Sequence, residues 1–279
     1  MLILTFEKQK TMTEQILMIV AILIIVYFVV RMSKKIPSKL AQDDELKLTE
    51  KEELKLSKER KKALNEKVSF YKNLNDKDKL SFEKRVLDFL NEIKITGVDC
   101  EAEELDRVLI AASAIIPVFQ FPNWSYRNLD EVLLYPLPFN AHFSTEGDDT
   151  NIQGMVGNGF MNGKMILSKT SLRQGFQAEF DKKNVGIHEF VHLIDAEDGA
   201  IDGIPKVLMK QQFVLPWMNL IYKKINEIEK EKSDIRLYGA TNEEEFLAVA
   251  SEYFFEHHVQ FKKKHPELFE ILSYFYGAK

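Results

Sequence analysis

The segment 186–195, GIHEFVHLID, is apolar on nearly every side of a helix, a pattern typical of a helix inside a core. His188 and His192 stand four residues apart, so on a helix they share one face at about 6 Å. Burying two histidines and a glutamate without partners is costly. The segment therefore requires a fold with a buried helix and with partners for these polar side chains.

The same residues have the HExxH spacing of zinc hydrolases. Two imidazoles at this spacing can share one tetrahedral metal ion, and Glu189 lies where its carboxylate could accept a proton from an activated water. The alternative is a buried pair of histidines with a structural role, because a match of three residues also arises by chance. A third ligand is needed to decide between the two.

The composition excludes several classes of protein. A content of 45% hydrophobic and 11% aromatic residues in 279 positions suffices for a packed core, which excludes disorder throughout the chain. The net charge of −5 argues against a nucleic-acid partner. Cys100 is the single cysteine, so a metal site here would use histidine and carboxylate ligands.

The first part of the chain predicts a membrane anchor. Residues 16–30, ILMIVAILIIVYFVV, carry no charge, and their flanks extend this run toward the ~20 residues that a spanning helix needs. We expect a tail at 1–15, a single transmembrane helix at 16–32 and a charged spacer at 33–67. More basic residues follow the run than precede it, which places the main domain in the cytoplasm.

From Val68 to the end, the pattern is that of one packed domain that is predominantly helical with a small sheet. The glycines at 154, 157 and 159 are expected to form a turn that leads into a strand, rather than a phosphate-binding loop. The predicted helices are 80–93, 105–116, 184–199, 214–230 and 238–258, and the predicted strands are 132–136 and 164–168.

Residues 238–258, YGATNEEEFLAVASEYFFEHH, supply two candidates for a third metal ligand. Glu245 and Glu252 are two helical turns apart on one face. Glu245 would alternatively complete a capping box with Asn242, and Glu252 would be a carboxylate at the edge of the core. Spacing alone does not choose between them. The remaining histidines are expected at the surface or without metal-binding partners: His142, His257, His258 and His265.

GIHEFVHLID followed by YGATNEEEF resembles the Mlc titration factor A family of zinc-dependent peptidases. The second segment is also similar to a stretch of the anthrax lethal factor catalytic domain. The resemblance covers about 68–279 and implies an α+β, zincin-like metallopeptidase domain with one Zn²⁺ per chain. It implies that Glu245 joins His188 and His192 as the third ligand, and that Tyr238 helps to stabilise the oxyanion of the reaction.

The chain departs from the pattern of many glutamate zincins at Val249, where those proteins carry an acid four residues after the ligand. Support for the ligands is therefore expected from Asp195 or Glu252. By analogy with zincins, the strand KMILS at 164–168 is expected to be the sheet edge that pairs with an extended substrate.

These features predict a membrane-anchored zinc peptidase with Glu189 as general base and with peptides or proteins as substrates. The family resemblance implies an aminopeptidase-like preference. One alternative is a regulatory protein that captures a protein partner, as the name of the family suggests, with the metal site secondary. The other is a structural membrane protein whose HExxH is incidental.

Overall fold

The computed structural model describes residues 18, 20–31, 56–147, 149–157, 161–177 and 182–278. The chain divides into two compact units, Met1–Leu54 and Lys55–Lys279, which we describe separately. In the first unit, residues 20–31 are helical. Among the described residues, no helix combines the length and the apolar character that crossing a membrane requires.

The transmembrane helix predicted at 16–32 is thus not found in the described part of the chain. Four of its residues, at positions 16, 17, 19 and 32, lie outside the described residues, as do the predicted tail at 1–15 and most of the predicted spacer.

The second unit contains a small mixed sheet with the strand order β1-β2-β4-β3. β1 (Lys94–Gly97), β2 (Leu129–Tyr135) and β4 (Gly163–Ser168) run parallel, and β3 (Gly154–Val156) pairs antiparallel with β4. Both predicted strands are present, as parts of β2 and β4. The turn that we expected at Gly154 is instead the beginning of β3, a strand too short to show alternation in the sequence.

The strand KMILS is not at the edge of the sheet, which contradicts our prediction. β4 has β2 on one side and β3 on the other, so its backbone donors and acceptors are already paired. The short strand β3 has only β4 as a neighbour in the sheet and is the edge strand on this side.

The first helices of the second unit begin before the predicted domain boundary at Val68. Leu64 is fully buried in the hydrophobic core, so residues that we assigned to the charged spacer pack into the second unit. These helices are α3 (Lys58–Lys67), α4 (Ser69–Lys72), α5 (Asp76–Glu92) and α6 (Glu104–Ile115).

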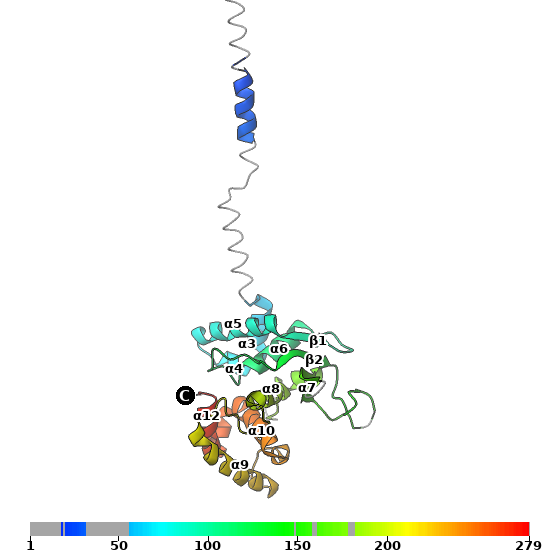
Figure 1. Ribbon diagram of the computed structural model, residues 1–279, viewed down its shortest axis with the longest axis vertical. Helices are drawn as coiled ribbons and strands as arrows, with labels where there is room; N and C mark the ends of the chain where they lie inside the picture. Colours follow the sequence, from blue (N-terminus) through cyan, green and yellow to red (C-terminus); the bar gives the residue numbers. More distant parts are fainter. Residues whose placement is uncertain are drawn as a thin grey trace, which may run out of the picture. The chain divides into compact units, whose positions relative to one another are not determined.

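The remaining helices follow the sheet strands, and short 3₁₀ turns connect several of them. In Figure 1, α8 lies between the layer that contains α5 and α6 and the layer that contains α10 and α12. The helices are α7 (Lys169–Gly175), α8 (Val185–Asp195), α9 (Val214–Glu229), α10 (Glu243–Glu256), α11 (His258–Lys264) and α12 (Pro266–Phe275); the 3₁₀ turns are η2 (Ala196–Asp198), η3 (Gln211–Phe213) and η4 (Leu237–Ala240).

α8 is the central helix, as its apolar sequence predicts. Ile187, Phe190 and Val191 are fully buried, and the helix packs against α6, β3 and β4 as well as against α10. The observed fold is therefore a mostly helical α+β domain built around the helix that carries both histidines.

Candidate metal centre

The two histidines of the motif lie side by side on α8. The helix begins after Asn184, whose side-chain oxygen accepts a hydrogen bond from the backbone N–H of Ile187 at 3.1 Å. One turn apart, the Nε2 atoms of His188 and His192 approach to 3.1 Å. Each ring therefore directs its own Nε2 atom toward the same point.

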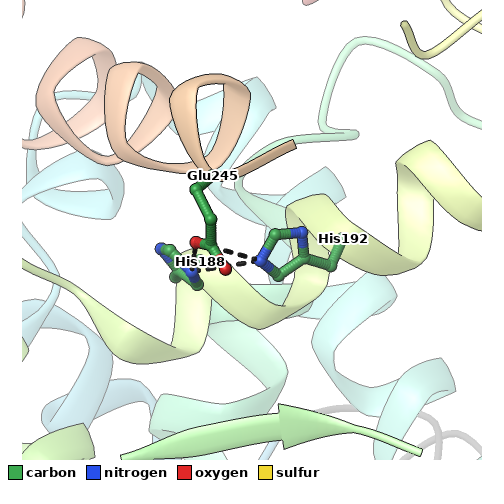
Figure 2. Close-up of side chains that lie close together, drawn as sticks. All are labelled: His188, His192 and Glu245. Atoms are coloured by element: carbon green, nitrogen blue, oxygen red, sulfur yellow. Dashed lines mark hydrogen bonds and ion pairs between the residues drawn. The ribbon is translucent and has the colours of Figure 1, made fainter. Parts of the chain in front are cut away.

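α10 brings Glu245 to the same point (Figure 2). Asn242 caps this helix by accepting a hydrogen bond from the Glu245 backbone N–H at 2.8 Å. The Glu245 side chain does not turn back to complete a capping box: its Oε2 lies 3.0 Å from His188 Nε2 and 3.6 Å from His192 Nε2. The cap therefore fixes the position of the helix and leaves the carboxylate to the histidines.

The three side chains fit a metal ion. One ligand atom from each of His188, His192 and Glu245 lies within 4.8 Å of the others, and in the described part of the chain this is the group of three that meets that condition. A tetrahedral ion with bonds of 2.0–2.1 Å separates its ligands by about 3.3 Å. Glu245 Oε2 is buried and meets only these two ring nitrogens, at 3.0 and 3.6 Å, so a cation between the three side chains would satisfy it.

Glu252 supports the first histidine from the opposite side of its ring. Its Oε1 lies 2.8 Å from His188 Nδ1, and its Oε2 accepts a hydrogen bond from the Asn184 backbone N–H at 2.6 Å. The second candidate for this role, Asp195, accepts a hydrogen bond from the Gly203 N–H at 2.8 Å. Glu252 therefore provides the carboxylate that Val249 does not.

The charges around the cluster favour a cation. Burial alone would lower the pKa of the His188 ring, but the neighbouring carboxylates Glu252 and Glu245 raise it to about 10. The pKa of Glu245 is held well below its usual range because the two histidine rings outweigh the effect of burial.

Glu189 faces a pocket beside the two histidines. The pocket has a volume of about 390 Å³ and is lined by residues 151–154 at the sheet edge, by His188 and by Tyr238. Burial raises the pKa of the Glu189 carboxyl, the shift expected for a group that takes up a proton near neutral pH. A Cβ at Gly154 would come within 2.6 Å of Glu189 Oε1, so this strand approaches the carboxylate closely.

Tyr238 lies on η4 at the open side of the cluster, and its side chain is half exposed. Its hydroxyl donates a hydrogen bond to Glu245 Oε1 at 3.1 Å. Burial and the Glu245 carboxylate raise the pKa of the phenol to about 12, so it remains a hydrogen-bond donor at neutral pH.

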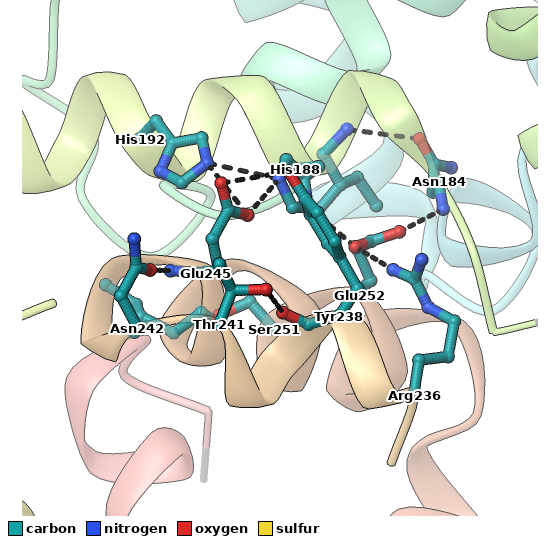
Figure 3. Close-up of polar contacts among 12 residues, drawn as sticks. Asn184, His188, His192, Arg236, Tyr238, Thr241, Asn242, Glu245, Ser251 and Glu252 are labelled. Carbon is teal, nitrogen blue, oxygen red and sulfur yellow. Dashed lines mark hydrogen bonds and ion pairs between the residues drawn. The ribbon is translucent and has the colours of Figure 1, made fainter. Parts of the chain in front are cut away.

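The structure thus brings together all five residues singled out in the sequence, and it adds one that sequence reasoning missed. Arg236 donates a hydrogen bond from Nη2 to Glu252 Oε1 (Figure 3). In the sequence, only its position two residues before Tyr238 indicated that Arg236 could lie near the site. Among the other histidines, His265 is buried beside Asp234 rather than exposed as expected.

The mostly helical α+β domain thus contains a His-His-Glu group that could hold a metal ion, the kind of ligand set found in zinc hydrolases. The comparison with protein families agrees: the chain belongs to the family described as glucose-regulated metallo-peptidase M90, whose profile matches residues 42–277.

Curated relatives extend this result. An uncharacterized protein of Synechocystis is 27% identical over 226 residues, which are 76% of this chain and 81% of that protein. Mlc titration factor A of Cronobacter sakazakii is 29% identical over 189 residues, 63% of this chain and 70% of that protein. The same factor of Escherichia fergusonii is 29% identical over 202 residues, 68% of this chain and 75% of that protein. The similarity to lethal factor is not tested by these matches.

Proposed function

We propose that this chain is a zinc-dependent peptidase in which His188, His192 and Glu245 hold one Zn²⁺. The observation that carries the proposal is the convergence of these three side chains beside a buried glutamate that faces a pocket. A structural histidine pair would need neither a carboxylate aimed at both ring nitrogens nor the pocket.

When bound, zinc acidifies water and polarises a carbonyl group. Glu189, buried at the pocket wall, accepts the proton of the attacking water and later delivers it to the leaving amine. Tyr238 donates its hydroxyl hydrogen to the oxygen on which negative charge develops, an interaction made chiefly in the transition state. The raised pKa of Tyr238 keeps that hydrogen in place at neutral pH.

The edge strand β3 is suited to bind an extended peptide. Gln153 and Gly157 form backbone hydrogen bonds with β4, so the backbone groups of Gly154 and Val156 face away from it. Residues 151–154 also line the pocket. N-methylation of the substrate amide that pairs with β3 would remove one or two hydrogen bonds. It should raise KM for a cleaved peptide by about tenfold and change kcat little.

The substrate class extends to short peptides with a free N-terminus, since the chain resembles a family with aminopeptidase-like activity. Comparing the cleavage of a short peptide with that of its N-acetylated form tests this preference. Equal kcat/KM for both forms would contradict it and favour an endopeptidase.

We also propose that residues 16–32 anchor the chain in a membrane as a single pass, with the peptidase domain in the cytoplasm. The support is the absence of charge over 16–30 and the excess of basic residues after it. Protease treatment of sealed, right-side-out vesicles tests it, because a cytoplasmic domain stays intact until the vesicles are opened.

Zinc content and peptide cleavage of the purified full-length chain test the central proposal. We expect one zinc per chain in the wild type, loss of zinc in Glu245→Ala, and retained zinc without cleavage in Glu189→Gln. A folded wild type that binds no added zinc would refute the proposal.

A regulatory function is the second candidate, because two relatives are named Mlc titration factor A. In that case the chain acts by capturing a protein partner and the metal site is secondary. Glu189→Gln discriminates between the two, since it removes a proton acceptor without changing the shape of the surface: the cellular function survives under capture and is lost under catalysis.

A further inference from the structure

Arg236 is not one of the proposed metal ligands, but its side chain contacts Glu252, the carboxylate that holds the ring of His188. It stands in the segment between α9 and η4, and its Nη2 donates a hydrogen bond to Glu252 Oε1 (Figure 3). The same carboxylate oxygen lies 2.8 Å from His188 Nδ1. One oxygen therefore links the guanidinium of Arg236 to the ring of the proposed ligand His188.

The Glu252 carboxylate is held from three parts of the chain. The Asn184 backbone N–H, at the beginning of α8, holds Oε2 at 2.6 Å, while Arg236 and His188 both contact Oε1. With both oxygens restrained, the carboxylate has little freedom to rotate. The ring of His188 is then fixed so that Nε2 faces His192 and Glu245.

Charge explains why an arginine is needed at this position. The Glu252 side chain is 1% exposed, and a carboxylate so deeply buried is costly without a paired cation. Glu189 and Glu245 add negative charge around the same histidines. Arg236 is 25% exposed and supplies the positive charge through a planar group that keeps a defined orientation.

We propose that Arg236 is a positioning residue for the metal site, which acts through Glu252 and His188 to keep the metal-binding nitrogen of His188 in place. This inference rests on the proposed zinc site, but not on peptidase activity. It predicts that losing Arg236 weakens metal binding more than it weakens folding.

The test is Zn²⁺ affinity of the full-length chain, measured by competition with a chromogenic chelator. We expect Arg236→Met to weaken Zn²⁺ binding by about tenfold, the smaller of the losses seen when residues that hydrogen-bond metal ligands are replaced. Arg236→Lys should recover part of this loss. Arg60→Met is the matched control, since Arg60 pairs with Glu104 at 2.7 Å and is also 25% exposed, but joins α3 to α6. It should leave zinc affinity unchanged.

A double-mutant cycle separates positioning from a general structural effect. If Arg236 acts through Glu252, adding Arg236→Met to Glu252→Gln should change zinc affinity by less than twofold, although each change alone weakens it. The unfolding temperature of the metal-free protein, measured on the same variants, shows whether the loss of affinity exceeds any loss of folding stability.

Three results would overturn the inference: unchanged zinc affinity in Arg236→Met, additive effects in the cycle, or a loss of affinity fully accounted for by unfolding. Each of these leaves the zinc site itself intact. A wild type that binds no zinc would instead refute the proposed function, and this inference with it.

Discussion

Two groups of histidine and carboxylate side chains, each built around a buried histidine, differ in how completely they are paired. In the metal-site cluster, His188, His192 and Glu245, the oxygen Oε2 of Glu245 meets the two ring nitrogens and no N–H or O–H donor from another residue. In the Asp234 cluster, both carboxylate oxygens of Asp234 are occupied: Oδ1 by His265 at 2.7 Å, and Oδ2 by Lys182, Tyr253 and Lys264 at 2.6–2.9 Å.

The difference shows how a binding site can be told from a structural one when both contain buried histidine. Burial alone would raise the pKa of Asp234, but the hydrogen bonds from its four partners hold it well below the usual range. That cluster is complete without a ligand. The metal-site cluster instead directs two ring nitrogens and a carboxylate oxygen at one another, an arrangement that a bound cation would complete.

Removing the metal should produce the largest effect on stability. This effect should depend on the metal-site cluster and not on the Asp234 cluster. With free Zn²⁺ a thousandfold above its Kd, bound zinc stabilises the fold by about 4 kcal/mol, which a chelator removes. Thermal unfolding of the full-length chain with zinc or with chelator measures the shift. Asp234→Asn should keep this shift, whereas His192→Ala should abolish it; equal unfolding temperatures for the wild type under both conditions would contradict the assignment.

Removing the charge of Asp234 should have the next largest effect, this time on folding. Asp234→Asn leaves Lys182 and the buried His265 without their anion, and we expect it to cost about 2–3 kcal/mol, less than a fully buried pair because Asp234 is partly exposed. Urea unfolding measures the change. Zinc affinity should not change, and a variant that folds normally but loses zinc would show that the two clusters are coupled.

Gly154→Ala should affect catalysis at the first cluster without changing metal binding. The added methyl group would come within 2.6 Å of Glu189 Cγ and Oε1, and because Glu189 is buried its carboxylate must shift. We expect kcat for a cleaved peptide to fall by between about ten- and a hundredfold. Met155→Ala, on the same strand, is the control. Full activity in Gly154→Ala would show that the strand leaves more room than its backbone position indicates.

The sequence predicted those parts of the site that depend on local spacing. His188, Glu189 and His192 follow from the periodicity of one helix, and Asn242 caps α10 as a good capping residue should. Glu245 could not be separated from a capping residue by spacing, because its N3 position serves both roles; only the resemblance indicated it as a ligand.

Long-range pairing accounts for what the sequence did not show. Arg236 and Glu252 are sixteen residues apart, and their contact depends on how the segment before η4 packs, not on a helical repeat. Likewise, the inner position of β4 depends on parallel pairing with β2 and on the three-residue strand β3, neither of which leaves a local signal.

A third charged group, on the sheet, should give the smallest effect because its cations are in contact with water. Glu131 on β2 bonds Lys164 on β4 and Lys94 on β1, and these hydrogen bonds, with one from Thr96, lower its pKa to about 2. The Lys94 side chain is 72% exposed and that of Lys164 is 37% exposed, so the solvent-screened contribution is about 1 kcal/mol.

The pH dependence of this contribution follows from the direction of the shift. An unfolded chain binds a proton at Glu131 near pH 4.3, and the folded chain only near pH 2, so the stabilisation is complete above about pH 4.3 and is lost as the pH falls toward 2. The difference in unfolding free energy between wild type and Glu131→Gln should therefore be constant from pH 7 to 5 and shrink below pH 4. A difference that grows on acidification would mean that Glu131 is stabilised in its protonated form. A difference as large as that of Asp234→Asn would mean that exposure to water does not separate the two groups.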